Sequence, residues 1–137
     1  MVPIFISCLQ HFSIIGYTGH RPAIPLTLEG LEHLEYRGYD SSGVGYVTSK
    51  KLKVVRAAGK LQHLKEKLAQ ESDCLTVTTA IGHTRWATHG VPEERNAHPH
   101  CNNSHDLCIV HNGIIENYLE IKEELLAKGY HFDSDTD

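Results

Sequence analysis

Residues 74–90 read CLTVTTAIGHTRWATHG, a β-branched stretch that runs directly into a polar motif containing the only tryptophan of the chain. Because β-branched residues favour extended backbone, this stretch predicts a strand that ends near Arg85. Arginine offers a planar fork of donors that fits a carboxylate, and Thr88 and His89 can add hydrogen bonds beside it. The motif is typical of a loop that holds a small anion, with Trp86 as an apolar wall; a surface loop with a salt bridge is the alternative.

Length, charge and cysteine content limit the possible classes of protein. The 137 residues suffice for one domain with a hydrophobic core. A net charge of −4 without a basic stripe argues against a nucleic-acid partner, and no apolar run is long enough to cross a membrane. The four cysteines form no CxxC pair and the N-terminus lacks the features of a signal peptide, so we expect reduced thiols in the cytoplasm.

Short strands and amphipathic helices alternate on both sides of the opening stretch. Apolar and β-branched patterns predict strands over 14–18 and 106–113 and a hairpin over 43–59 that turns at TSKK. Helical spacing of apolar residues predicts helices over 24–34, 61–68 and 117–130. Hairpin connections outnumber crossovers, which indicates an α+β fold with helices on a mostly antiparallel sheet.

A second motif, VHNGIIEN (110–117), places Asn112 and Gly113 between a predicted strand and a predicted helix. A side-chain amide and a backbone N–H that point at one place can stabilise an oxyanion. Asn-Gly is also a common pair in tight turns, so a purely structural turn is the alternative.

More than half of the eleven histidines lie between His83 and His111, close to Cys101 and Cys108. Imidazole and thiolate ligands bind zinc, but the spacings in NAHPH (96–100) and the residues after it match no finger or ribbon pattern. We therefore expect no metal and interpret these histidines as polar residues around a pocket; a histidine- and cysteine-based metal site is the alternative.

The stretch LEYRGYDSSG (34–43) follows the first predicted helix and contains Arg37, Tyr39 and Asp40. It is interpreted either as a helix end with a local ion pair or as one wall of the same pocket.

Five motifs taken together resemble the glutaminase domain of class II glutamine amidotransferases, and within that class the glutamine–fructose-6-phosphate aminotransferase (isomerizing) family. They are LEYRGYDSSG, HTRWATHG, NAHPH, VHNGIIENY and SDTD, in that order. The resemblance covers residues 14–137, and residues 1–13 form a non-matching N-terminal extension. It implies an N-terminal-nucleophile (Ntn) fold, an αββα sandwich of antiparallel sheets, here truncated.

The resemblance also implies roles for individual residues and requires no cofactor. Arg85, helped by Thr88 and His89, would hold the α-carboxylate of glutamine, and Asp137 would hold its α-amino group. Asn112 and Gly113 would form the oxyanion hole. Trp86 would cover the bound glutamine, and Arg37 and Tyr39 would line the side of the site that faces the nucleophile.

The nucleophile of the family is an N-terminal cysteine, whose position here falls on Phe12. Phenylalanine has no thiol, and eleven residues precede it, so neither the nucleophile nor its free amine is present. Cys8 lies four residues earlier, about 13 Å away in an extended strand, and Ser13 would point to the opposite face. We therefore expect an inactive fragment of an enzyme of hexosamine synthesis.

The sugar-phosphate half, which would bind fructose 6-phosphate, is not contained in this sequence, and full-length members of the family are expected to be homo-oligomers. Two further interpretations stay open: a fragment that binds glutamine without cleaving it, and a class II amidotransferase with another acceptor, as in purine synthesis.

Overall fold

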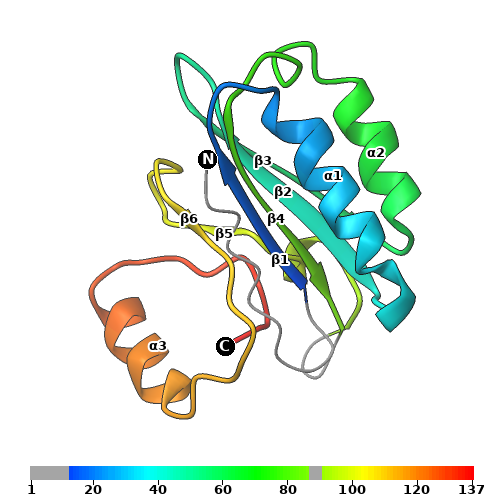
Figure 1. The fold of residues 1–137 in the computed structure, drawn as a ribbon. Helices are drawn as coiled ribbons and strands as arrows, with labels where there is room; N and C mark the ends of the chain where they lie inside the picture. Colours follow the sequence, from blue (N-terminus) through cyan, green and yellow to red (C-terminus); the bar gives the residue numbers. More distant parts are fainter. Residues whose placement is uncertain (1–12, 87–90) are drawn as a thin grey trace.

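A four-stranded antiparallel sheet forms the centre of the molecule, and the computed structural model describes residues 13–86 and 91–137 (Figure 1). The strands are β1 (Ser13–Thr18), β2 (Ser41–Val47), β3 (Leu52–Ala58) and β4 (Thr79–Arg85), and their order across the sheet is β1-β4-β2-β3. The strand predicted up to Arg85 is confirmed at that end but begins only at Thr79. β4 therefore lies inside the sheet, with β1 and β2 on either side.

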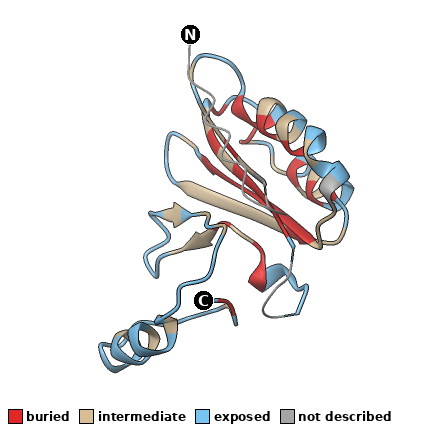
Figure 2. Cartoon of the chain, turned by 60° about the horizontal axis from the view of Figure 1, so that its bottom comes forward, coloured by how far each residue is buried: buried red, intermediate tan, exposed pale blue. Residues whose placement is uncertain are grey.

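Two helices, α1 (Ala23–His33) and α2 (Leu61–Ala69), cover one face of this sheet (Figure 1). The helical spacing of Leu61, Leu64 and Leu68 puts these side chains on one side of α2, and all three are buried, as predicted. The core that forms beneath the helices is the main buried region of the described chain (Figure 2); it also includes Ile15, Leu31, Val44, Tyr46 and Ala80.

The β2–β3 hairpin turns at Thr48–Lys51, where the TSKK turn was predicted. The Thr48 N–H donates to the Lys51 carbonyl at 2.9 Å, and the Thr48 hydroxyl accepts from the Lys50 and Lys51 N–H groups at 3.2 and 3.0 Å. The threonine side chain thus satisfies backbone donors that the short turn leaves unpaired.

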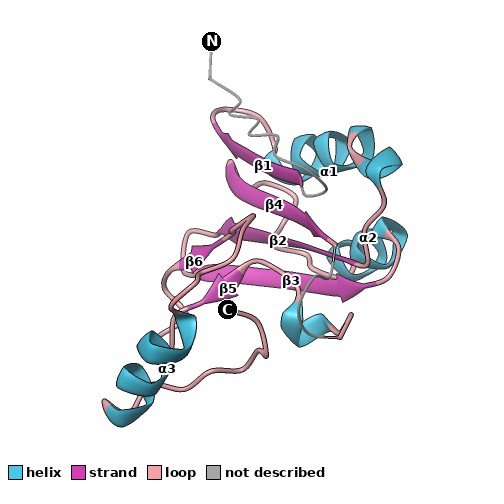
Figure 3. Cartoon of the chain, turned by 90° about the horizontal axis from the view of Figure 1, so that it is seen from below, coloured by secondary structure: helices cyan, strands magenta, loops and turns pink. Residues whose placement is uncertain are grey.

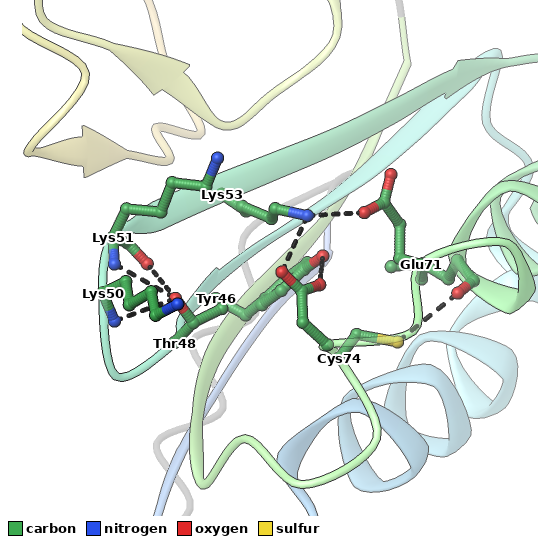
Figure 4. A network of polar contacts seen from close by, with 9 residues as sticks. Tyr46, Thr48, Lys50, Lys51, Lys53, Glu71 and Cys74 are labelled. Atoms are coloured by element: carbon green, nitrogen blue, oxygen red, sulfur yellow. Dashed lines mark hydrogen bonds and ion pairs between the residues drawn. The ribbon is translucent and has the colours of Figure 1, made fainter.

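The connection from α2 to β4 is fastened to this hairpin by a polar network (Figure 4). Lys53 Nζ lies 2.7 Å from a carboxylate oxygen of Glu71 and 2.8 Å from one of Asp73. The hydroxyl of the buried Tyr46 donates to Asp73 Oδ1 at 3.3 Å. Burial and the negative charge of Asp73 raise the pKa of Tyr46, so the phenol stays protonated and acts as a donor.

The other face of the sheet carries a two-stranded antiparallel sheet, β5 (His100–Cys101) with β6 (Cys108–Ile109), and beyond it the helix α3 (Tyr118–Ala127) (Figure 3). The strand predicted over 106–113 is thus reduced to two residues, and its partner β5 was not predicted. The helix predicted over 117–130 is confirmed as α3, which ends at Ala127. Gly129 comes shortly after it, and its φ of 87° suits a helix end.

The predicted α+β class is confirmed: helices, the larger sheet, the smaller sheet and a further helix follow one another as layers (Figure 3). A single turn of 3₁₀ helix, Glu35–Arg37, separates α1 from Gly38. Within residues 13–86 and 91–137, no helix has the length and apolar character to cross a membrane.

Candidate functional site

His83 and Arg85 project from the face of β4 that is turned away from α1 and α2. Alternate residues of a strand share a face, and both side chains are buried, with 1% and 5% exposure. Opposite His83 on β2 stands Gly43. A Cβ atom at Gly43 would lie 2.1 Å from the carbonyl oxygen of His98, so only glycine lets the segment at His98 lie directly on β2.

Three histidine rings pack against one another close to Arg85, one pair tilted and the other edge to face. The ring centroids of His83 and His98 are 4.5 Å apart, and those of His98 and His100 are 4.4 Å apart. Burial lowers the pKa to about 4 for His83, about 2 for His98 and about 4 for His100, with smaller contributions from neighbouring charges, among them Arg85 and, for His100, first Arg56. All three rings are therefore neutral at pH 7, next to a guanidinium that stays charged.

His83 fixes the side chain of Asn112. Its Nε2 lies 2.6 Å from Asn112 Oδ1, and because a carbonyl oxygen can only accept, Nε2 carries the proton and donates it. The amide nitrogen of Asn112 is then turned away from His83 and free to donate elsewhere. The sequence interpretation gave His83 no role. Because alternate residues of a strand share a face, the predicted strand already placed His83 on the same face as Arg85, and this pattern would have identified it.

Asp137 lies next to the turn that contains Asn112 and Gly113. Its Oδ2 accepts a hydrogen bond of 2.5 Å from the N–H of Ile115. The charge of Asp137 raises the pKa of His100 while that of Arg85 lowers it, so both charged groups lie within electrostatic reach of this one ring. The structure thus bonds Asn112 to His83, and Asp137 to the backbone two residues after Gly113.

Asn96, the first residue of NAHPH, tethers the segment that carries Asp137. It is fully buried; its Oδ1 accepts from the Asp135 N–H at 2.9 Å, and its Nδ2 donates to the Val91 carbonyl at 3.1 Å. Thr136 Oγ1 adds a contact of 3.3 Å to His100 Nε2. The motifs NAHPH and SDTD therefore form one hydrogen-bonded unit, which sequence reasoning did not foresee.

Trp86 is half exposed and packs over Gly38. Gly38 has a φ of 77°, and a Cβ atom there would lie 2.4 Å from Cζ3 of the indole, so this position requires glycine on both grounds. Trp86 thus contacts the LEYRGYDSSG motif, in which Arg37 ends the 3₁₀ turn.

The Tyr39 hydroxyl bonds to residues on either side of the connection between α1 and α2. It donates to Glu35 at 2.5 Å and accepts from the Leu61 N–H at 2.6 Å, at the start of α2. Burial, together with the bond to Glu35, raises the pKa of Tyr39 to about 12. These contacts fasten the 3₁₀ turn to the start of α2, and the place of Tyr39 beside the nucleophile stays a prediction.

A cavity of about 830 Å³ lies between β3, the β5–β6 hairpin and the C-terminal stretch. His98, His100, Ile115 and Asp137 are among the residues that line it, whereas Arg85 and Asn112 are not. Asp137 therefore faces the cavity, and Arg85 and Asn112 do not. Phe12, Thr88 and His89 lie outside the described residues, so their roles stay predictions.

The described part of the chain contains no group of three or more His, Cys, Asp or Glu side chains arranged to hold a metal ion. The alternative of a histidine- and cysteine-based metal site gains no support from this part of the molecule.

Comparison with known proteins places this geometry in a family. A family model described as the glutamine amidotransferase domain matches residues 41–137. Glutamine–fructose-6-phosphate aminotransferases (isomerizing) of Synechocystis sp. and Fusobacterium nucleatum are 55% and 54% identical over 124 and 125 residues, 90% of this chain in each case. The chain spans only 19% and 20% of the length of these two relatives.

Solved structures show the same fold. The allosteric regulatory enzyme of purine biosynthesis matches 87% of this chain and 26% of its own, with a TM-score of 0.72 and 28% identity. Glutamine phosphoribosylpyrophosphate amidotransferase of B. subtilis, in complex with ADP and GMP, matches 90% of this chain and 27% of its own, with a TM-score of 0.67 and 29% identity. The expected resemblance and the Ntn-type α+β fold are thereby confirmed, and the chain belongs to the glutamine amidotransferase domain family.

Proposed function

We propose that this domain is the glutaminase part of a glutamine–fructose-6-phosphate aminotransferase, which would pass the amide nitrogen of glutamine to a sugar phosphate in hexosamine synthesis. The relatives named for this activity are 55% and 54% identical to the chain. The purine-synthesis enzymes, the alternative acceptor class, are 28% and 29% identical and are similar mainly in fold.

The observation that carries the proposal is the 2.6 Å bond from His83 to Asn112. It orients the amide so that Asn112 Nδ2, together with the Gly113 N–H, would donate to an oxyanion, as the resemblance implies. In an acyl-transfer reaction at the glutamine side chain, negative charge develops on the carbonyl oxygen, and oriented donors stabilise it without having to rearrange.

Arg85 and Asp137 provide the opposite charges that a free amino acid requires. The guanidinium would pair with the α-carboxylate and the Asp137 carboxylate with the α-ammonium. Thr88, His89 and Trp86 would complete the carboxylate side and cover the ligand, as the resemblance implies.

The resemblance implies that Phe12 stands at the sequence position of the nucleophile, so we propose that the chain with this sequence binds glutamine without hydrolysing it. A thiol would have to attack the amide carbon, release ammonia and form a thioester that water then cleaves. A benzyl side chain can do none of this. An assay of glutamate release is expected to show no turnover, and turnover that a thiol alkylator abolishes would contradict the proposal.

Glutamine binding gives the direct test of the charged residues. Replacement of Arg85 by Ala is expected to weaken the binding of glutamine, measured by isothermal titration calorimetry, by about tenfold to a hundredfold, because a charge-assisted bidentate pair is lost. Arg85→Lys keeps the charge without the fork and is expected to lie in between. Arg21→Ala, at an exposed position, serves as the control. Equal affinities for the unaltered chain and Arg85→Ala would remove Arg85 from the site.

The acceptor, the assembly and the location belong to the same proposal. Fructose 6-phosphate would bind in the part of the relatives that this chain does not match, and the whole protein would be a cytoplasmic homo-oligomer. Phosphoribosylpyrophosphate is the competing acceptor, and an assay of the full-length protein with each sugar phosphate would separate the two.

A further inference from the structure

Cys101 and Cys108 face each other across the β5–β6 pair, where they are register partners. The Asn102 N–H donates to the Leu107 carbonyl at 3.1 Å, one residue further along, so the two cysteines occupy a position whose own backbone groups do not bond to each other. In such a position Cα atoms are about 4.5 Å apart and the side chains lie on the same face. This separation is within the range of roughly 4.4 to 6.8 Å that disulfides require.

The loop between the two cysteines already holds this register. Asn102 Oδ1 accepts from the N–H groups of Asp106 and Leu107, both at 3.1 Å, and its Nδ2 donates to Asp106 Oδ1 at 2.6 Å. Because side-chain bonds to the backbone fix the turn, the thiols are held opposite each other without a covalent link. Formation of a bond between them would then cost little further conformational entropy.

Both thiols can be reached by a small molecule. Cys101 lines the cavity of about 830 Å³, and Cys108 lines a second hollow of about 690 Å³ beside the β2–β3 turn. Both are free cysteines of intermediate exposure, whereas Cys74 is buried and donates to the Leu68 carbonyl. Cys108 Sγ lies over Gly45, where a Cβ atom would approach it to 2.8 Å, so the absence of a side chain at position 45 leaves room for the sulfur.

We propose that Cys101 and Cys108 form a reversible disulfide by exchange with a low-molecular-weight disulfide such as oxidised glutathione. A thiolate of the pair attacks the glutathione disulfide, forms a mixed disulfide and releases one glutathione. The second thiolate then attacks the sulfur bound to the protein, closes the bond and releases the other glutathione. Two protein thiols are oxidised and one glutathione disulfide is reduced to two thiols, which balances atoms and electrons.

The order of attack follows from the surroundings of the two sulfurs. Burial raises the pKa of both thiols, to about 11 for Cys108. At Cys101 the Arg56 guanidinium opposes this rise, so Cys101 is the better first nucleophile. The proposal does not depend on glutamine binding, since it involves neither Arg85 nor Asn112.

The test uses the full chain, equilibrated in buffers of reduced and oxidised glutathione, quenched with an alkylating reagent and digested with trypsin. Both cysteines lie on the peptide 96–122, while Cys8 and Cys74 fall on other peptides. As the buffer becomes more oxidising, this peptide is expected to lose two hydrogen masses and to take up no alkylating group. A peptide 96–122 that stays doubly alkylated, or that carries only glutathione, across the whole series would overturn the proposal.

Two asparagine variants separate a preformed pair from accidental oxidation. Asn102→Ala removes the bonds that hold the register and is expected to lower the equilibrium ratio of disulfide to dithiol by about tenfold. Asn103→Ala is the matched control, because Asn103 bonds to the backbone of His131 and not to the hairpin. An unchanged ratio in Asn102→Ala would contradict the argument. Cys101→Ser is expected to leave Cys108 alkylated or glutathionylated, with no loss of two hydrogen masses.

Discussion

His83 is a buried, neutral imidazole beside a guanidinium, and its position makes the fold sensitive to acid. The pKa of His83 in the folded chain is about 4, against 6.5 for an unperturbed histidine. The unfolded chain therefore binds the proton more readily between these two values, so the free energy of unfolding falls as the pH is lowered. The contribution of the neutral His83 side chain to the free energy of unfolding is fully present above pH 6.5 and is lost as the pH falls towards 4.

We expect His83 to account for about 2 kcal/mol of the stability lost between pH 6.5 and pH 5, from its shift in pKa. In His83→Gln this part of the pH dependence should be absent, whatever the overall loss of stability, because glutamine does not titrate. Urea unfolding at a series of pH values measures the slope. His20→Gln, at an exposed position, is expected to keep the slope of the unaltered chain; an unchanged slope in His83→Gln would contradict the assignment.

At the scale of single residues, the sequence could propose Arg85, Asn112 and Gly113 from the chemical character of their motifs, and Asp137 only through the resemblance; their roles stay predictions. It could not show that His83 holds Asn112 or that Asn96 holds Asp135, since these bonds join segments that are far apart along the chain. Nor could the sequence show that the Tyr39 hydroxyl accepts a hydrogen bond from the N–H of Leu61, the first residue of α2.

At the scale of elements, the contact between β2 and the segment at His98 positions the histidine cluster. It exists because Gly43 has no side chain to hold the two backbones apart. Hydrophobic patterns predicted α1, α2 and the β2–β3 hairpin, since each has a buried side of its own. β5 could not be predicted, and the strand predicted over 106–113 is reduced to β6, because these two-residue segments become strands only by pairing with each other.

The late start of β4 has a similar cause. The Val77 carbonyl accepts a hydrogen bond from the N–H of Ala23, the first residue of α1, and the Thr78 carbonyl accepts one from the N–H of Gly19, in the loop before α1. These residues are therefore engaged with a loop and not with a neighbouring strand, although their β-branched side chains favour extended backbone.

Gly43→Ala is expected to lower the free energy of unfolding by about 2 to 4 kcal/mol, because the new methyl group would meet a backbone carbonyl 2.1 Å away and neither backbone can move without breaking the sheet. Gly16→Ala, in β1, is the matched control, since nothing lies within 4 Å of its Cβ position, and it is expected to change stability little. Equal stabilities of the two variants in urea unfolding would show that the β2 contact does not limit the fold.

At the scale of the whole molecule, the larger sheet and its two helices hold most of the buried core, while α3 buries none of its residues (Figure 2). Leu119, Ile121 and Leu126 on α3 are exposed by 60%, 42% and 49%. Apolar spacing predicted this helix correctly, but helical spacing does not say what packs against a helix. The relatives are about five times as long as this chain.

Helices of about ten residues are marginal in water without packing, so α3 is expected to open locally far more often than α2. Hydrogen–deuterium exchange should show the amides of Tyr118–Ala127 exchanging at least about a hundredfold faster than those of Leu61–Ala69, whose apolar side is buried. Similar protection in the two helices would mean that α3 is covered in solution, for instance by a second copy of the chain.

The tether at Asn96 has a consequence for how variation in this protein should be interpreted. The side-chain amide of Asn96 bonds both to Val91 and to Asp135. A replacement that moves the backbone at Val91 is therefore expected to shift the segment that carries Asp137, although it makes no contact with Asp137 itself. A variant that loses ligand affinity need not, for this reason, lie anywhere near the ligand. Such effects should travel along the chain of contacts from Val91 to Asp137 and fade in the two helices on the far side of the sheet.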